Sequence, residues 1–549
     1  MKRYIFPKLL CLTLALGLSL GAAKAQESSV EIVTTYTPEV AAATKLLAPT
    51  SIADDPRIDP EIAYQVTPSL WQISLEAHNF NPARASYWDY ISYKRLFAKA
   101  AVGYPLATDG RIRYTFQTPK VGYLGIGVDH LGDFAARTDY GPRSIAQSYT
   151  MHNRASVGGG LFVGNYLLEG AIKYDNDIYH SYAAAKPEEL MFHNAELGVK
   201  FGDEFVDLKH LNFSVEAHAD LWAHRLPMIA DEAESAQSLN AGASVTLARD
   251  FSGNTITLKL QGDVWGGYRP ENCFGGSVDY ARKFGFVQIE AGLGYLYDKV
   301  GAHPKASHYI LPRAKALFDL GKSAFVPYVE VDTELKHNSL RALYESNPYI
   351  DFDANRTALL GMKNSLDYNL SLGFTGTLFS SRLAYHLFAG ASFMRDHLFW
   401  CVTEQGLFGV TTGNNTRIFV GVGAEAMPVA GLKLDLDFAY YFDDYSSMYL
   451  LSEPNMRGNV SAEYTLRKWK FYVGGDMVGA RSTSMLVEGK MDKFDMPLTF
   501  DLGAGLSYRI NRMFEVYADG KNLLNSKIYD YAHYYRPGIG FMLGVKMDF

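Results

Sequence analysis

The sequence predicts an all-β protein, a transmembrane antiparallel β-barrel of about 22 strands. Two observations support this fold class. Apolar and polar residues alternate with a period of two in many segments, and the connections between these segments are tight and long in turn. A period of two gives each segment one apolar and one polar face, as in a β-strand. An export signal at the start then indicates which solvent the apolar face meets.

Residues 1–25 are predicted to be a secretory signal peptide. The stretch begins with basic residues, continues with an apolar run and ends in Ala23-Lys24-Ala25. This is the order of a cleavable export signal, so the mature chain is expected to start at Gln26. No later stretch reaches the roughly 20 apolar residues that a membrane helix needs. Any crossing of a membrane is therefore expected to use strands.

The composition is acidic and rich in aromatic residues. The chain has 52 Lys and Arg against 59 Asp and Glu, a net charge of −7. Four of the basic residues lie in the signal peptide, so the mature chain is at −11. This balance argues against a nucleic-acid partner, and 14% aromatic residues fit the girdles of a membrane barrel. Cys273 and Cys401 make no disulfide framework, although a single bridge between surface loops stays open.

Segments 366–379 and 432–441 illustrate the alternation. In the first, leucine and aromatic residues at even positions alternate with Asn, Ser and Thr at odd positions. In the second, leucines alternate with one lysine and two aspartates. The apolar face is expected to meet lipid and the polar face a water-filled lumen. The predicted lumen-lining residues, either as plain lining or as partners of a segment that fills the lumen, are Glu330, Asp332, Glu334, Asp435 and Asp437.

The connections separate a barrel from a soluble sandwich, which would also alternate. Tight turns are predicted at 118–120, 164–165, 252–254, 283–285, 321–322, 380–381, 430–431, 467–469 and 511–512. Longer polar stretches lie near 133–153, 180–190, 226–237, 338–365, 400–416, 445–457 and 486–496. Outer-membrane barrels have short turns on the periplasmic side and long loops outside. The predicted strands start near residues 96, 109, 121, 154, 166, 191, 211, 238, 255, 272, 286, 307, 325, 366, 382, 408, 432, 457, 470, 497, 514 and 536.

The final third resembles the carboxy-terminal end of the TonB-dependent receptor barrel. The stretch LSYRINRMFEVYADGKNLLNSKIYDY contains the Asn522-Leu523-Leu524-Asn525 pattern of the penultimate strand, and Arg536-Pro537-Gly538 opens the last one. The stretch VEIVTTYTPEVAAATKLLAPTSI is similar to the opening of plug-poor, receptor-like barrels of Bacteroidota, and VEIVTT is faintly similar to a TonB box. The resemblance implies a protein of the Gram-negative outer membrane, surrounded by its lipid, that transports or binds a nutrient. It also implies barrel assembly machinery and TonB, or a separate plug protein, as partners.

The segment 26–95 departs from this family. It is a short periplasmic or lumenal segment ahead of the barrel at 96–549, and prolines are scattered through it. It is too short and too interrupted for the usual plug domain. Barrels of this width need filling. The lumen is expected to be closed by residues 26–95, by the loops 133–153 and 338–365 folded inward, or by a partner protein.

The last strand is expected to close the cylinder. In Arg536–Phe549, apolar residues alternate with Gly, Met, Lys and Asp. Pairing of this strand with 96–104 would remove the last free edge. The resemblance further implies that Phe549 is the signal that the assembly machinery recognises.

The chain shows no motif of catalysis, so neither catalytic residues nor a cofactor nor a metal is predicted. Metalloprotease, nucleophile-elbow, phosphate-loop and zinc-spacing patterns are missing from the sequence. Asp396-His397 with Asp443-Asp444 is better explained as a polar rim than as a protease site, and 351–355 lacks the glycine of a calcium loop. A nutrient transport or binding barrel is the first function class. A structural or assembly component closed by partner proteins is the second, and a surface hydrolase ranks last.

Overall fold

The computed structural model describes residues 95–549 except 119–120, 136–147, 226–236 and 322. All of these residues belong to one compact unit, Thr67–Phe549. The predicted signal peptide and residues 26–94 lie outside the described residues. Within the described part, no helix is long and apolar enough to cross a membrane.

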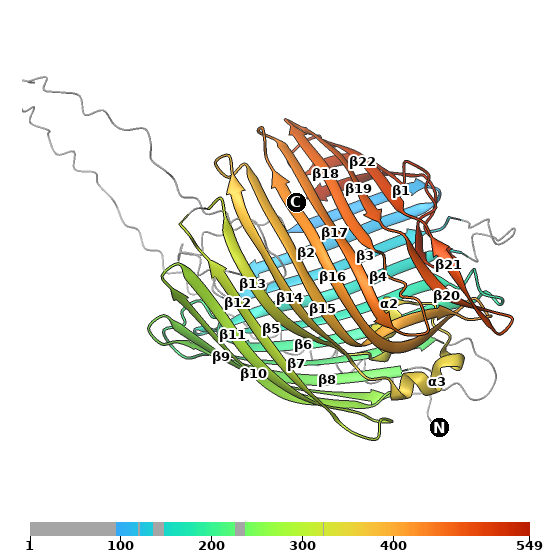
Figure 1. Cartoon of the computed structure of the whole chain (residues 1–549). Helices are drawn as coiled ribbons and strands as arrows, with labels where there is room; N and C mark the ends of the chain where they lie inside the picture. Colours follow the sequence, from blue (N-terminus) through green and yellow to red (C-terminus); the bar gives the residue numbers. More distant parts are fainter. Residues whose placement is uncertain (1–94, 119–120, 136–147, 226–236, 322) are drawn as a thin grey trace, which may run out of the picture. The chain divides into compact units, whose positions relative to one another are not determined.

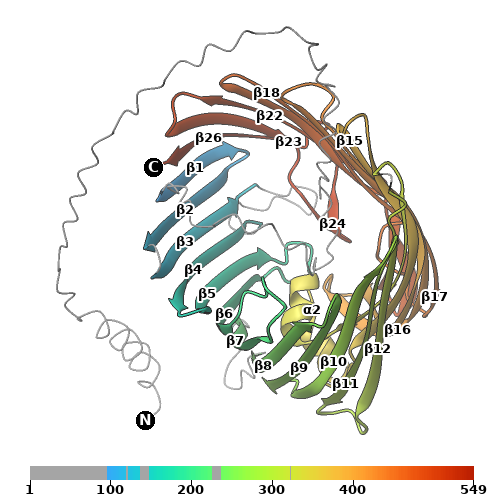
Figure 2. The same ribbon diagram turned by 90° about the vertical axis from the view of Figure 1, so that its left-hand side faces the viewer.

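The described chain forms a closed antiparallel β-barrel (Figures 1 and 2). The main sheet has 24 strands, and the cylinder has 22 because β20 and β21 form a hairpin outside its order. Each strand pairs with the next, and β1 pairs with β26 from Phe97↔Asp548 to Tyr104↔Phe541. The predicted closure is confirmed.

The barrel strands are β1 (Leu96–Tyr104), β2 (Ala107–Thr118), β3 (Gly122–Asp133), β4 (Thr150–Val163), β5 (Tyr166–His180), β6 (Glu189–Gly202), β7 (Asn212–Arg225), β8 (Gln237–Asp250), β9 (Asn254–Gly267), β10 (Glu271–Phe284), β11 (Val287–Val300), β12 (Ser307–Phe318), β13 (Val326–Lys336), β14 (Ser365–Leu378), β15 (Leu383–Val402), β16 (Phe408–Ala426), β17 (Leu432–Ser446), β18 (Met456–Leu466), β19 (Trp469–Val478), β22 (Thr499–Arg509), β23 (Phe514–Lys521) and β26 (Gly540–Asp548).

The strand count and fold class predicted from the sequence are confirmed, and each predicted strand start lies within four residues of the observed one. The differences lie in the long connections. The stretch 486–496, predicted as a loop, is part of the hairpin β20 (Arg481–Val487) and β21 (Lys490–Met496). A small two-stranded sheet, β24 (Tyr529–Tyr531) and β25 (Tyr534–Tyr535), precedes the last strand. That strand begins at Gly540 rather than near 536, because Pro537 has no N–H to donate to a ladder.

The apolar faces point outward, as the alternation predicts. Leu370 and Leu372 on β14 and Leu434 and Leu436 on β17 are all among the exposed apolar side chains. Similar residues continue round the cylinder, where lipid covers them in a membrane barrel. The intervening polar residues lie on the opposite face of each strand.

The two rims differ, as predicted. Most connections from an even-numbered strand to the next odd-numbered one are tight turns, although those at 203–211 and 319–325 are longer. In Gly164-Asn165, for example, Gly164 has a φ of +65°, which a two-residue hairpin turn requires. The longest connections lie at the opposite rim, which also has short turns at 105–106 and 268–270. The longest one, 337–364, contains α2 (Leu340–Ser346) and α3 (Phe352–Gly361).

The wall is interrupted between β12 and β13. These strands share four register pairs, from Ala314↔Val331 to Leu317↔Tyr328, whereas β13 and β14 pair along eleven residues. The next positions would place Pro312 opposite Thr333, and proline has no N–H for the ladder. The Thr333 hydroxyl instead donates to the Pro312 carbonyl at 2.7 Å.

Above this break, the tops of β13 and β14 lie on the lumen side of β12. Tyr309 and Leu311 have the inward parity of β12, because Ile310 between them is exposed. Leu335 and Leu366 have the outward parity of their strands, yet they pack in the same buried cluster as Tyr309 and Leu311. The hairpin therefore leans inward and carries segment 337–364 into the ring of strands, where Figure 2 shows α2. Of the predicted ways to close the lumen, inward folding of 338–365 is observed.

Candidate ligand site in the barrel lumen

The inner wall of β2–β7 carries oppositely charged residues on neighbouring strands. Arg154 on β4 pairs with Asp175 on β5, and Lys173 pairs with Glu196 on β6 at 3.5 Å. Such cross-strand pairs stabilise their register. Since the inward side chains alternate with exposed apolar ones such as Ile172, this wall presents charge to the lumen and hydrocarbon to the outside.

Helix α2 packs against this wall. The Ser339 hydroxyl caps it by accepting from the Ala342 N–H at 3.2 Å. Its apolar side is buried: the Tyr344 ring lies 5.2 Å from that of Trp222 on β7, centroid to centroid. Its polar side points at the charged wall through Arg341, and the partners of this guanidinium are Glu196 at 2.5 Å, Glu345 at 2.7 Å and Asp220 at 3.6 Å.

An inner cavity of about 620 Å³ lies between α2 and the charged wall. Burial alone would lower the pKa of Arg341, but hydrogen bonds to Glu345 and Glu196 outweigh it and raise the pKa, so the guanidinium stays charged. The cavity thus combines fixed charges of both signs with aromatic rings. Its lining includes Arg113, Asp129, Arg154, Lys173, Asp175, Asp177, Tyr179, Glu196, Trp222, Arg341, Tyr344 and Glu345.

An outer cavity of about 650 Å³ lies at the long-loop rim and is rich in tyrosine. The rings of Tyr349 and Tyr534 stack with centroids 3.6 Å apart. Burial raises the pKa of Tyr531 to about 12, so this phenol is a neutral hydrogen-bonding group at physiological pH. Arg536 pairs with Asp530 at 2.9 Å and Asp501 at 3.3 Å. The lining includes Tyr104, Leu131, His152, Tyr179, Tyr182, Tyr349, Asp501, Asp530, Tyr531, Tyr535 and Arg536.

The two cavities share Tyr179. Aromatic side chains supply flat apolar contact with a polar tip, and charged groups fix the orientation of a polar ligand. This arrangement suits binding. In the described part of the chain, no group of three or more His, Cys, Asp or Glu is placed to hold a metal ion.

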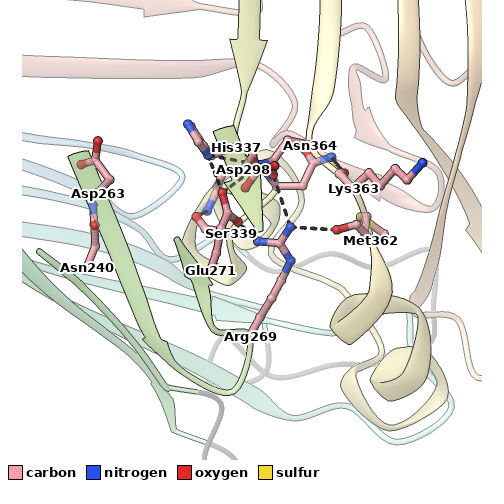
Figure 3. A network of polar contacts seen from close by, with 12 residues as sticks. Asn240, Asp263, Arg269, Glu271, Asp298, His337, Ser339, Met362, Lys363 and Asn364 are labelled. Atoms are coloured by element: carbon pink, nitrogen blue, oxygen red, sulfur yellow. Dashed lines mark hydrogen bonds and ion pairs between the residues drawn. The ribbon is translucent and has the colours of Figure 1, made fainter. Parts of the chain in front are cut away.

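A buried polar network fixes both ends of segment 337–364 to the wall (Figure 3). Arg269 pairs with Glu271 at the start of β10, and it also donates to the Met362 carbonyl at 2.8 Å. The Asn364 amide donates to Glu271 at 2.7 Å and to Asp298 on β11 at 2.9 Å. His337 Nδ1 lies 2.6 Å from Glu271 Oε1. These five residues, Arg269, Glu271, Asp298, His337 and Asn364, are called the latch below.

The five predicted lumen-lining carboxylates do not line either cavity. Three of them pair with lysines: Glu330 with Lys315 at 3.3 Å, Glu334 with Lys336 at 3.5 Å, and Asp435 with Lys433 at 3.3 Å. The lumenal role predicted for the five, with Asp332 and Asp437, stays a prediction. The charged residues of β2–β7 obey the same parity, so the alternation could have identified them as well.

The other sequence candidates have structural partners. Asp351 caps α3 by accepting from the Ala354 N–H at 2.9 Å, which explains the acidic stretch 351–355. Cys273 and Cys401 are both free, so the bridge left open by the sequence does not form. His397 Nε2 lies 3.0 Å from Glu453.

Glu453 ties the connection between β17 and β18 to the wall. Arg417 lies 2.6 Å from Glu453 and 2.7 Å from Asp443. Burial alone would raise the pKa of Glu453, but the hydrogen bond with His397 and the charge of Arg417 outweigh it and bring the pKa to about 2, from an ordinary 4.5.

The lowered pKa predicts a pH-dependent loop. A carboxylate with a depressed folded-state pKa adds stability above its unfolded value, and this contribution is lost as the pH falls. We therefore expect the 447–455 connection to loosen between about pH 4.5 and pH 2. Protease nicking of the folded barrel as a function of pH measures this. Glu453→Gln should remove the transition in that window, and an unchanged profile in this variant would contradict the assignment.

No protein-family model matches the chain, and no curated protein matches it. Solved structures do. The copper transporter OprC aligns with a TM-score of 0.63 at 13% identity, over 83% of this chain and 81% of OprC. The FrpB iron transporter from Neisseria meningitidis aligns with a TM-score of 0.64 at 9% identity, over 83% and 81%. The fold is that of an outer-membrane receptor barrel.

A third structure agrees. The pyoverdine outer membrane receptor FpvA from Pseudomonas aeruginosa PAO1 aligns with a TM-score of 0.63 at 8% identity, over 83% of this chain and 79% of that one. At such identities the likeness concerns the fold. The expected resemblance to the barrels of TonB-dependent receptors is confirmed at this level.

Proposed function

We propose that the protein is an outer-membrane receptor of a Gram-negative bacterium that binds a nutrient and takes it up through the barrel. The observation that carries the proposal is the pair of cavities, which share Tyr179 inside a closed barrel. The fold likeness to transporters and receptors supports it. The long-loop rim would face the outside and the tight-turn rim the periplasm, as in other outer-membrane barrels.

The proposed partners follow from this function. Outer-membrane lipid would cover the apolar belt. TonB would couple uptake to energy, and a separate plug or partner protein would help to close the lumen. The VEIVTT stretch that suggested TonB lies outside the described residues. Collapse of the membrane potential by an uncoupler should stop accumulation of the nutrient if TonB is used, and leave it unchanged if the barrel is passive.

The inner cavity can be tested with two matched lysines. Lys173 and Lys200 both face the lumen and pair with a glutamate on the next strand, at 3.5 and 3.2 Å, but only Lys173 lines the cavity. A hydrogen bond to a charged group contributes about 1.5–3 kcal/mol, so Lys173→Met should weaken ligand binding about tenfold or more. Lys200→Met should not.

The measurement uses cells that lack the gene, complemented with each variant and supplied with a panel of labelled nutrients. Equal uptake in the two variants would contradict the proposed site. A stable multi-protein complex whose loss has no nutrient-dependent effect would instead support the second function class, a structural or assembly component.

We also propose that Phe549 is recognised by the barrel assembly machinery. Its ring is exposed on the outer face and meets that of Phe514 edge-on at 5.7 Å, and its backbone bonds to Leu96 across the closure. Phe549→Ala should lower the amount of inserted barrel more than Phe541→Ala, which removes an outward ring from the same strand. Quantifying heat-modifiable barrel in outer-membrane fractions tests this, and equal yields would remove the special role of Phe549.

A further inference from the structure

An apolar groove crosses the outer wall where the barrel closes. Its volume is about 730 Å³, and its lining comes from seven neighbouring strands: β19, β22, β23, β26, β1, β2 and β3. Cavities of about 300–1,000 Å³ hold small organic ligands. The apolar side chains of the lining point away from the lumen, since Val102 on β1 and Leu543 on β26 are both 65% exposed. The groove is therefore separate from the two lumenal cavities.

The groove runs across the strands and not along them. Five lining residues are successive register partners on neighbouring strands: Trp469, Tyr508, Val516, Val545 and Ala100. Trp469 is the first residue of β19, beside a tight turn, whereas Ala100 lies in the middle of β1. The groove therefore starts at the tight-turn rim and rises toward the middle of the wall.

The floor of the groove is low because its side chains are small. Ala100 lies opposite Gly110 on β2. Val102 and Leu543, which are register partners on the same face, form a raised edge beside them. A hydrocarbon chain lying along this edge gains van der Waals contacts that a smooth wall does not offer. Inside a membrane such packing is a main source of affinity, because the surrounding lipid is as apolar as the site.

The lower end of the groove carries aromatic rings and basic residues. The rings of Trp469 and Tyr508 lie 4.5 Å apart, centroid to centroid, and Lys468 Nζ lies 6.0 Å from the centroid of the Tyr508 ring. Arg467 precedes Lys468 in the same turn, and both are exposed. Within the described part of the chain neither of them pairs with a carboxylate, and the Lys468 ammonium donates to the Ile510 carbonyl at 3.0 Å. Two positive charges are thus available where the groove reaches the tight-turn rim.

We propose that the groove binds one anionic phospholipid of the periplasmic leaflet, with an acyl chain in the groove and the phosphate at Arg467 and Lys468. A guanidinium and an ammonium are complementary to a phosphate. Trp469 and Tyr508 place amphipathic rings at the level of the headgroup, where such side chains gather in membrane proteins. The inference goes beyond the proposed function, because it concerns the outer face and no nutrient. It shares with that proposal the orientation of the tight-turn rim toward the periplasm.

The experiment titrates purified, folded barrel in an uncharged detergent with phosphatidylglycerol or with phosphatidylcholine, and counts the bound lipids by native mass spectrometry. We expect one phosphatidylglycerol to bind about tenfold or more tightly than phosphatidylcholine, because two basic residues face its headgroup. The double variant Arg467→Gln with Lys468→Gln should remove this preference. Lys470→Gln is the matched control, because Lys470 lies on the opposite face of β19 and pairs with Glu463 at 2.8 Å.

A second pair of variants tests the groove itself. Ala100→Leu fills the floor and should weaken the binding of both lipids. Ala98→Leu, on the same face of β1 but outside the groove, should leave it unchanged. Heat-modifiable gel mobility verifies that each variant is folded before lipid is added. Should Ala100→Leu fail to fold, the charge variants, which alter an exposed turn, carry the test.

Four outcomes would overturn the site. Equal affinity for the two lipids would show that Arg467 and Lys468 do not select the headgroup. An equal loss in Lys470→Gln would show a general attraction of the barrel for anions. Displacement of the lipid by glycerol phosphate, which has no acyl chain, would show a site for free phosphate. A dimer that excludes lipid and is lost in Ala100→Leu would assign the groove to a second copy of the chain.

Discussion

Leu436→Arg should sharply reduce the amount of folded barrel, whereas Asp437→Arg on the next residue should be tolerated. Leu436 lies on the outward face of β17 and Asp437 on the opposite face, which is predicted to line the lumen, and both side chains are exposed. Arginine near the middle of the bilayer costs about 2–4 kcal/mol in a membrane barrel. An arginine at 437 would face water and lie near Asp435, whose charge favours it.

The two substituted positions are neighbours on β17, so they lie on opposite faces of the strand but at nearly the same depth in the bilayer. Each variant is therefore a control for the other. Urea unfolding in lipid vesicles, followed by heat-modifiable gel mobility, gives the free energy of unfolding for both. Equal losses would mean that the strand faces are assigned wrongly, and the whole alternation would have to be shifted by one residue.

Gly103→Val should destabilise the closure of the barrel. Gly103 on β1 is paired with Met542 on β26, and a Cβ at Gly103 would lie 2.7 Å from the Phe541 carbonyl oxygen and 2.8 Å from the Met542 Cγ. The carbonyl belongs to the backbone of the closing strand and cannot move away without breaking the ladder. Overpacking of this kind costs about 1–3 kcal/mol.

Gly198→Val is the matched control for the closure. Gly198 also lies within a barrel strand, β6, but a Cβ there meets no atom within 4 Å. The unfolding free energy of the two variants in the same vesicles separates a clash at the closure from the general effect of valine in a strand. A loss confined to Gly198→Val would contradict the β1–β26 register.

The strands could be predicted because their signals are local. A side-chain period of two and turn residues at the tight rim depend on neighbours in the sequence, and both recur for the length of the barrel. The pairing of β26 with β1 could be predicted as well, because in a closed cylinder the first strand is the free neighbour that remains for the last one. The same reasoning would have found the charged wall of β2–β7 had the parity been followed strand by strand.

The position of segment 337–364 inside the barrel and its side-chain partners could not be predicted from such local signals. The helix N-cap at Ser339 can be predicted from the residue type. The sequence contains no signal, however, that Arg341 pairs with Glu196, 145 residues earlier. The latch is equally hidden, because its members come from separate strands and connections with no fixed spacing. Pro312 was the available local signal, since a proline within a strand interrupts a ladder.

The break at Pro312 also gives the barrel a direction of weakness under mechanical load. A hairpin pulled out of a sheet resists in proportion to the ladder bonds that must rupture together, and the β13–β14 hairpin shares four register pairs with β12 where β11 and β12 share twelve. When the chain is drawn out of a membrane one hairpin at a time, the β12–β13 edge should yield at a lower force than its neighbours. The circumference is therefore not uniformly stiff, and the softest part of the wall is the part that carries the helices.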